Sequence, residues 1–295
     1  MADTDGLIPP VDDGDLSVVL KRLMSRHSST RKSADSRRRL ANDGLTQEYL
    51  EAGLRLIGKQ LRAEKPAEEP DEEEFDDQAR PFFDWLSQNK VIDEVAHGEV
   101  GLHGSAGTLR DRWPFRSDFI EDLLTYSLWV RHWAPHVEVA ESAIEPLANA
   151  EDFVEAVHLL AYYDLMLLSE STTYRLSLIA AATAERDTTA RQAMGEMYHI
   201  LHGTWRELYD RTLRTRGMRL RPDISIDDVA VLLSAMTEGL RLRMTSDPTT
   251  QIVDAERQRS LLGLGALALI AGCVDPGDGR PVEDVAAELA EPPED

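Results

Sequence analysis

Apolar residues recur every three or four positions along most of this chain, the spacing that places them on one face of an α-helix. Glycine and proline mark the breaks, as at Gly217 and at the Asp247-Pro248 pair. No segment alternates apolar and polar residues as a half-buried strand does, so we expect an all-α fold. The pattern predicts helices over residues 46–62, 81–97, 117–133, 136–148, 151–169, 171–184, 188–216, 226–245 and 254–272.

A short element between two of these helices suggests a function. A glycine-rich turn, HGEVGLHGSAG, leads into a predicted helix over 106–113, and Pro114 separates it from a long helix capped by Ser117. A short helix, a turn, a second short helix and a long helix follow one another in helix-turn-helix DNA readers. In this arrangement Leu109 and Trp113, four residues apart, would pack inward.

The opposite side of this second helix would then face DNA. The first turn of the next helix can meet a phosphate through its backbone N–H groups and the helix dipole. We therefore predict the DNA-binding residues to be Ser105, Thr108, Arg110, Arg112, Arg116 and Ser117. The alternative is that these arginines are solvated surface and that Trp113 is only part of the core.

The formal net charge of −22 argues at first against nucleic acid, because phosphate binding depends on clustered Lys and Arg. The charge is unevenly distributed, however. Residues 63–80 form a proline-containing acidic insert with nine acidic and two basic residues, whereas residues 21–40 hold eight basic residues and one acidic residue. A flexible basic arm of this kind can follow the DNA backbone or enter the minor groove, although an ordinary charged tail has the same composition.

The stretch GTLRDRWPFRSDFIEDLL at 107–124 resembles the G-T-L-Y-x-x-F-x-x-K-x-x-L hallmark of TetR-family transcriptional repressors. Gly107, Thr108 and Leu109 match it directly. Arg110 stands where the family usually has a phosphate-contacting tyrosine, and the acidic insert and the longer turn also depart from the family pattern. A second resemblance covers residues 216–244, which include the triplet Glu238-Gly239-Leu240.

The resemblance implies that the C-terminal half forms a ligand pocket and a dimer interface. Helices 226–245 and 254–272 are apolar on nearly all sides and must be covered. Burial within a monomer would cover them, but the resemblance favours a four-helix homodimer interface. Aromatic and Met residues supply candidates for a pocket that takes a small apolar or aromatic effector, although such residues more often belong to a core. These candidates are Trp129, Trp133, Tyr162, Met166, Tyr174, Met197 and Trp205, with Tyr163, Tyr198 and Tyr209 as further ones.

No catalytic constellation is present, so we expect neither an enzyme nor a cofactor or metal. His199 and His202 lie three apart, but the spacing indicates no third ligand. A single cysteine excludes a disulfide framework, and the longest apolar run is too short for a membrane span. We therefore expect a cytoplasmic protein without membrane contact.

The leading hypothesis is a dimeric regulator that binds double-stranded DNA and responds to a small molecule. Its alternative is a co-regulator with a degenerate reader that acts through protein contacts, and a helical enzyme or carrier ranks last. The predicted organisation is a flexible extension with its basic arm over 1–40, a DNA-binding domain over 41–133, a ligand-binding and dimerisation domain over 134–275, and an acidic tail over 276–295.

Overall fold

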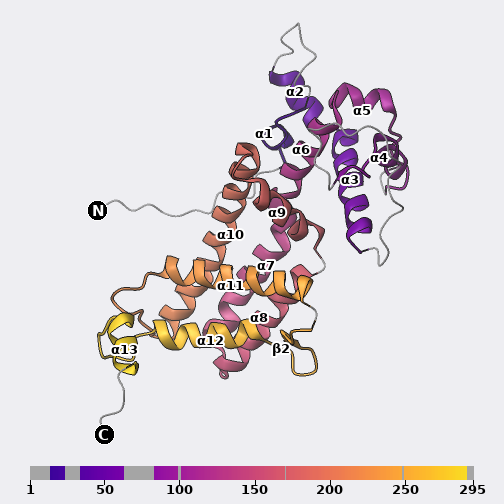
Figure 1. Cartoon of the computed structure of the whole chain (residues 1–295). Coiled ribbons are helices and arrows are strands. Elements are labelled where there is room, and N and C mark those ends of the chain that lie inside the picture. The colour runs from indigo at the N-terminus through magenta and orange to yellow at the C-terminus, as the bar shows by residue number, and fades with distance from the viewer. Residues whose placement is uncertain are drawn as a thin grey trace. The chain divides into compact units, whose positions relative to one another are not determined.

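The computed structural model of the chain describes residues 14–23, 34–62, 83–98, 101–169, 171–247 and 249–290. The acidic insert at 63–80 and the middle of the basic segment, residues 24–33, lie outside these ranges. The predicted all-α fold is confirmed, since the described residues are almost entirely helical (Figure 1). The chain divides into two compact units, residues 1–132 with 172–197 and residues 133–171 with 198–295.

The N-terminal unit is built around one long helix, α3, which packs against α4, α6 and α9. The inward stripe of α3 includes Tyr49, Leu50 and Ile57, all fully buried. The helices of this unit are α1 (Leu16–Val19), α2 (Ala34–Ala41), α3 (Gly44–Arg62), α4 (Gln88–Val95), α5 (Ala106–Arg112), α6 (Arg116–Ser127), α9 (Thr172–Thr183) and the first part of α10 (Thr188–Thr215).

Two helices of this unit are shorter than the sequence pattern predicted. α4 begins only after Ser87, whose hydroxyl accepts the N–H of Lys90 at 3.3 Å and so caps the helix. α6 ends at Ser127 and is followed by a short 3-10 helix over Val130–Trp133. The spacing of apolar residues does not reveal such breaks, because buried apolar residues such as Leu86 and Val91 occur on both sides of them.

The described parts of the predicted N-terminal extension are folded. Leu16, Leu20 and Leu23 are buried, and α1 packs against both α2 and α6. The carboxylate of Asp122 on α6 accepts the backbone N–H groups of Lys21 and the next residue at 2.7 and 2.8 Å. Residues 14–23 and 34–40 therefore belong to the folded unit and not to a flexible arm.

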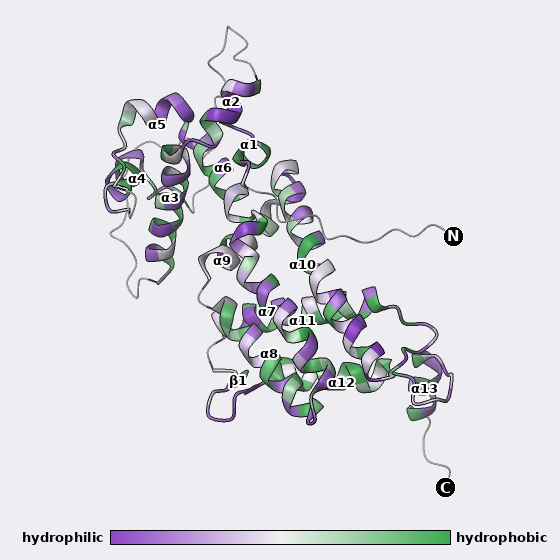
Figure 2. Ribbon diagram, turned by 180° about the vertical axis from the view of Figure 1, so that it is seen from behind, coloured by the Kyte–Doolittle hydropathy of each residue, from purple (hydrophilic) through white to green (hydrophobic). Residues whose placement is uncertain are grey.

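The C-terminal unit has α8 at its centre, packed against α7, α11 and α12. α12 is hydrophobic along nearly its whole length, as Figure 2 shows. The elements of this unit are α7 (Ala134–Asn149), α8 (Phe153–Ser169), the rest of α10, α11 (Ile226–Ser246), β1 (Val253–Asp254), β2 (Arg259–Ser260), α12 (Leu261–Cys273) and α13 (Val282–Leu289).

The helix predicted over 254–272 is wrong at its start. Residues 253–254 and 259–260 pair as two short antiparallel strands, and the helix begins only at Leu261. Ser260 caps it by accepting the N–H of Gly263 at 3.3 Å, and the N–H of Leu261 donates to the carbonyl of Ile252 at 2.9 Å. Residues 255–258 between the strands are mostly polar, so they offer no apolar face that could hold another helical turn against the core.

Much of the predicted acidic tail is also part of the fold. The buried guanidinium of Arg221 donates to the carbonyl of Gly272 at 2.9 Å, to Asp278 at 3.0 Å and to the carbonyl of Arg280 at 2.8 Å. These bonds fix the turn that leads into α13. The segment up to residue 290 is therefore folded, and residues 291–295 lie outside the described range.

Candidate DNA-binding surface and ligand pocket

The predicted reading helix is present as α5, with the turn after α4 placed before it. Ser105 caps α5 by accepting the N–H of Thr108 at 3.2 Å, and the Thr108 hydroxyl accepts the N–H of Ser105 at 3.0 Å, which forms a capping box. The Tyr49 hydroxyl on α3 lies 2.6 Å from the Thr108 hydroxyl and 3.1 Å from the Ser105 carbonyl. The start of α5 is thus fixed to the central helix of the unit.

The inner side of α5 is apolar, as its four-residue spacing predicted. Leu109 and Trp113 are each 1% exposed. The Trp113 ring stands edge-on to Phe119 at a centroid distance of 5.1 Å, and its indole N–H donates to Asp122 at 2.8 Å. Burial raises the pKa of Asp122 to about 6 despite these donors. Asp122 therefore joins the end of α5 to α1 through α6.

Arg112 does not project outward, contrary to our prediction. Its side chain is 8% exposed and donates to Thr46 Oγ1 at 2.8 Å, to the Thr108 carbonyl at 3.0 Å and to Asp43 Oδ1 at 2.6 Å. The guanidinium also lies over the Tyr49 ring at 5.8 Å from its centroid. Asp43 and Thr46 offer Arg112 internal acceptors, so it joins α5 to the turn between α2 and α3.

Arg116 is also engaged within the unit. Its guanidinium donates to the carbonyl of Leu86 at 3.0 Å and to that of Phe83, and it lies 3.5 Å from a carboxylate oxygen of Asp84. These contacts hold the segment that precedes α4. Ser117, next to it, is exposed at the first turn of α6, and no side chain caps this helix end. Of the predicted phosphate-contacting pair, Ser117 is the member turned to solvent.

The solvent-facing side of α5 is narrow. It consists of Gly107, Arg110 and Asp111, with Ser105 exposed just before the helix. Among the described residues Arg110 finds one partner, Gln88, whose Oε1 accepts a long hydrogen bond of 3.4 Å from Nε. Thr108 is partly exposed, but its hydroxyl is committed to the cap. Arg110 is therefore the candidate base-contacting residue that is positioned to meet a partner.

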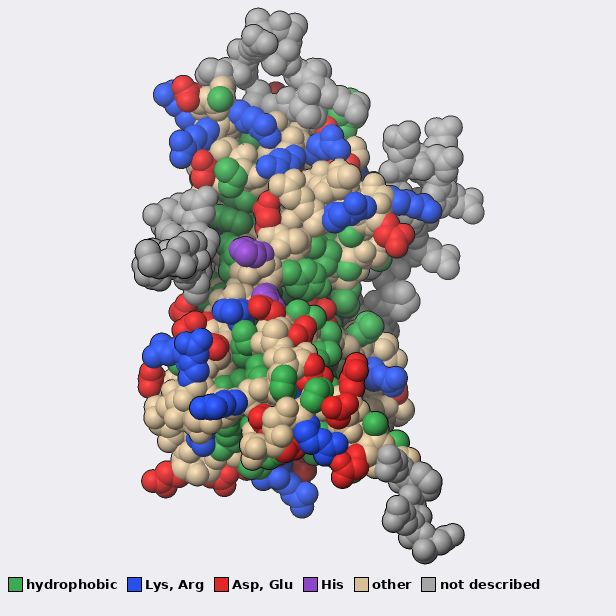
Figure 3. Space-filling model, turned by 90° about the vertical axis from the view of Figure 1, so that its left-hand side faces the viewer, with side chains coloured by type: hydrophobic (Ala, Val, Ile, Leu, Met, Phe, Trp, Pro, Cys, Tyr) green, Lys and Arg blue, Asp and Glu red, His purple; other side chains and the backbone are tan. Residues whose placement is uncertain are grey.

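Further positive charge comes from α2, whose last turn carries Arg38 and Arg39. Both are exposed; Arg38 pairs with Asp15 at 2.8 Å, and the described residues offer Arg39 no ion-pair partner. Lys and Arg side chains are numerous at the end of the unit that carries α2 (Figure 3). Asp43, which lies two residues after the end of α2, forms an ion pair with Arg112 and so links the end of α2 to α5.

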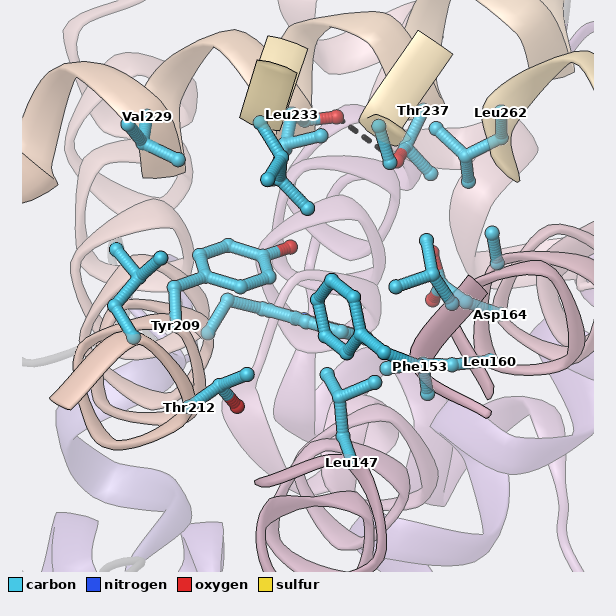
Figure 4. Close-up of a pocket in the computed structure, with 16 residues that line it drawn as sticks. Leu147, Phe153, Leu160, Asp164, Tyr209, Thr212, Val229, Leu233, Thr237 and Leu262 are labelled. Carbon is cyan, nitrogen blue, oxygen red and sulfur yellow. Dashed lines mark hydrogen bonds between the residues drawn. The ribbon is translucent and has the colours of Figure 1, made fainter. Parts of the chain in front are cut away.

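The C-terminal unit contains an apolar pocket of about 680 Å³, a volume that includes the open space at its mouth (Figure 4). Its walls come from the end of α7 and from α8, α10, α11 and α12, and all of its lining residues belong to this one unit. The lining residues are Leu147, Phe153, Val157, Leu160, Ala161, Asp164, Trp205, Tyr209, Thr212, Leu213, Val229, Leu233, Thr237, Leu262, Ala266 and Ile270.

Of the seven pocket residues that we predicted, Trp205 alone lines this pocket, and the further candidate Tyr209 joins it. Four of the others are buried core residues, namely Trp129, Trp133, Tyr174 and Met197. Tyr162 is half-buried and Met166 is 37% exposed, both on α8. We had chosen the candidates because they are aromatic or Met residues, but the walls of the pocket are mainly aliphatic. Residue type alone therefore could not distinguish pocket residues from core residues.

A buried polar group that the sequence analysis missed lies at the pocket wall. Asp164 Oδ1 accepts from the Arg241 guanidinium at 3.3 Å and lies 3.9 Å from Nδ1 of His136. Burial raises the pKa of Asp164, although Arg241 opposes the shift, and burial lowers the pKa of His136 to about 3. His136 is therefore neutral, and the buried ion pair consists of Asp164 and Arg241.

α11 and α12 each expose an apolar stripe. On α11 it includes Val231, Leu232 and Leu242, which are 56%, 48% and 49% exposed; on α12 it includes Leu261 and Leu264, at 41% and 59%. Val231 and Leu242 are eleven residues apart and Leu261 and Leu264 are three apart, so each pair lies on one side of its helix, and Leu232 adjoins Val231. Such stripes are typical of surfaces that bind another protein chain.

Within the part of the chain that the structure describes, no cluster of three His, Cys, Asp or Glu side chains could hold a metal ion. His202 instead lies 3.2 Å from Asp227. None of the described helices is long and apolar enough to cross a membrane.

The chain was compared with known protein families, curated proteins and solved structures. Residues 166–271, from α8 into α12, match the family model of the C-terminal domain of BetI-type transcriptional repressors. The match covers less than half of the chain and includes the stretch on which we based the second resemblance. No curated protein and no solved structure matches the chain.

Proposed function

Taking as our premise that this chain is a transcriptional regulator of the TetR family, we propose that it is a dimeric repressor that binds a specific DNA duplex and responds to a small apolar or aromatic molecule. The observation that carries the proposal is the position of α5. This short helix follows α4 after a turn, has its inner side fixed to α3 and α6, and keeps one side turned to solvent.

In the proposed complex Arg110 enters the major groove from the exposed side of α5. A guanidinium can donate two hydrogen bonds to the edge of a guanine, or it can bind a phosphate. Ser117 and the uncapped N–H groups of α6 bind a neighbouring phosphate. Arg39 on α2 adds a further phosphate contact. In this form of the basic-arm hypothesis, the contact to DNA comes from a folded helix.

We propose that the apolar stripes on α11 and α12 meet those of a second copy in a four-helix interface. Two-fold symmetry then gives two copies of α5, which read half-sites about one helical turn, roughly 34–36 Å, apart. A ligand in the pocket can regulate DNA binding only by favouring one of two arrangements of the dimer. The pocket supports this part of the proposal because α11 and α12 supply both the pocket wall and the exposed stripes.

One observation favours the alternative, a co-regulator that acts through protein contacts. Arg112 and Arg116 are committed to the fold, so fewer arginines face outward from the reader than the sequence suggested. The two proposals differ in whether the free dimer binds DNA.

The decisive experiment is a gel-shift titration with duplex DNA from upstream of the protein's own gene, over a series of salt concentrations. We expect nanomolar binding at low salt that weakens steeply as salt rises, because each phosphate contact releases counterions. A folded dimer that binds no duplex at low salt would favour the co-regulator.

The matched variants Arg110→Ala and Arg39→Ala separate base contacts from phosphate contacts. Arg110→Ala should cost about 1–3 kcal/mol on the specific site if it reaches a base. Arg39→Ala should weaken specific and non-specific duplexes alike and reduce the salt slope by about one unit.

A further inference from the structure

The pocket in the C-terminal unit has few polar groups, and they differ in whether the protein already satisfies their hydrogen bonds. Four of its lining residues carry polar side chains: Asp164, Tyr209, Thr212 and Thr237. The Thr237 hydroxyl donates to the Leu233 carbonyl at 2.9 Å, as the dashed line in Figure 4 marks. In the same view Tyr209 and Asp164 lie on opposite sides of the cavity, and the Tyr209 hydroxyl is directed inward. The Thr212 hydroxyl is buried and finds no hydrogen-bond partner among the described residues, so it contributes to the polar chemistry of the pocket beside Asp164 and Tyr209.

The Asp164 carboxylate retains capacity to accept a hydrogen bond. Arg241 donates to the main-chain carbonyl of Asp164 at 2.5 Å and to Oδ1 at 3.3 Å. Among the described residues none donates to Oδ2. Asp164 is 7% exposed and lines an apolar pocket, so a ligand that supplies a donor to its carboxylate stabilises the bound state.

The ion pair between Asp164 and Arg241 also determines which ligand charge the pocket can accept. Asp164 and Arg241 neutralise each other and are 7% and 4% exposed, so the wall has no net charge. A cationic ligand would leave an uncompensated positive charge among apolar side chains, and an anionic ligand would oppose Asp164. Burial also raises the pKa of Tyr209, so its phenol stays protonated and neutral.

From this arrangement we infer that the pocket binds an uncharged, mainly apolar molecule that donates one N–H or O–H hydrogen bond to Oδ2 of Asp164. The apolar part of the ligand lies against Phe153, Trp205 and the aliphatic wall, and the donor points toward α8. This inference rests on the proposed regulatory function for its biological meaning, but the binding itself can be measured without DNA.

The test uses two probes of nearly the same shape. Indole carries an N–H donor, and benzofuran has an oxygen at that position and donates nothing. Isothermal titration calorimetry on the full-length protein should show indole binding at least tenfold tighter than benzofuran. Asp164→Asn retains an oxygen for Arg241 and presents an NH₂ group to the pocket, so this preference should fall to less than threefold.

Two controls complete the design. Leu233→Trp fills the pocket and should abolish indole binding, which assigns the heat signal to this site. Tryptamine adds a positive charge to indole and should bind at least tenfold more weakly. Equal affinity for indole and benzofuran in the wild-type protein, tighter binding of tryptamine, or no binding of any probe would each overturn the inference. A gel shift on the same samples reports DNA binding separately, so a failure of the repressor proposal would be seen independently.

Discussion

Arg112 offers the sharpest test of the DNA-binding surface, because sequence and structure assign it opposite roles. If it is internal, Arg112→Ala removes its hydrogen bonds to Thr46, to the Thr108 carbonyl and to Asp43. Breaking a buried ion pair costs about 3–5 kcal/mol. Asp43 is 46% exposed and can be hydrated again, so we expect a loss of about 2–3 kcal/mol in the free energy of unfolding.

For a protein of this size a loss of that order lowers the melting temperature by roughly 3–5 °C. Thermal unfolding followed by circular dichroism measures the shift, and gel shifts well below the transition measure DNA affinity. Arg110→Ala is the matched control: it lies two residues away, is exposed, and should change stability by less than about 0.5 kcal/mol. An Arg112→Ala protein with unchanged melting temperature but lost DNA binding would refute the internal role.

Three further predictions concern pH, assembly and packing. Since burial raises the pKa of Asp122 from 3.8 to about 6, the folded chain holds a proton that the unfolded chain releases, so this group's contribution to stability falls as pH rises from about 4 to 6. Urea unfolding should show about 1 kcal/mol of this loss between pH 5 and 7, and Asp122→Asn should remove it. Leu264→Asp places a charge in the proposed interface and should give monomers in sedimentation velocity, whereas an unchanged dimer would move the interface elsewhere. Gly263→Ala puts a Cβ within 2.6 Å of His158 Nδ1 and should cost about 1–3 kcal/mol, while Gly272→Ala on the same helix meets nothing within 4 Å and should be tolerated.

The helices and the inner side of α5 could be predicted because they depend on local spacing. Leu109 and Trp113 are four residues apart, so a single helix turns both toward the core. The start of α12 could not be predicted in this way. It depends on the pairing of residues 253–254 with 259–260 and on the Ser260 cap. Neither feature can be recognised from the spacing of apolar residues.

The roles of charged side chains were the least accessible to sequence. Arg112 and Arg110 are the same residue type two positions apart. Arg112 is buried and donates to Asp43 and Thr46, whereas Arg110 is exposed and makes one long hydrogen bond to Gln88 among the described residues. Asp164 and Arg241 are 77 residues apart, and their pairing arises only when α8 and α11 pack together. The pocket depends on this three-dimensional arrangement, whereas our candidates were chosen by residue type.

Some side chains of α5 are needed to hold the helix in the fold and others are free to contact a partner, and this division limits how the protein can evolve. Four side chains hold the helix in place: Ser105 and Thr108 in the cap, Leu109 in the core and Arg112 at Asp43. Under the proposed function, mutations at these positions would be selected against through stability, whatever the DNA sequence. New operator preferences would therefore arise mainly at residues 107, 110 and 111, so related repressors that share this scaffold should diverge there first.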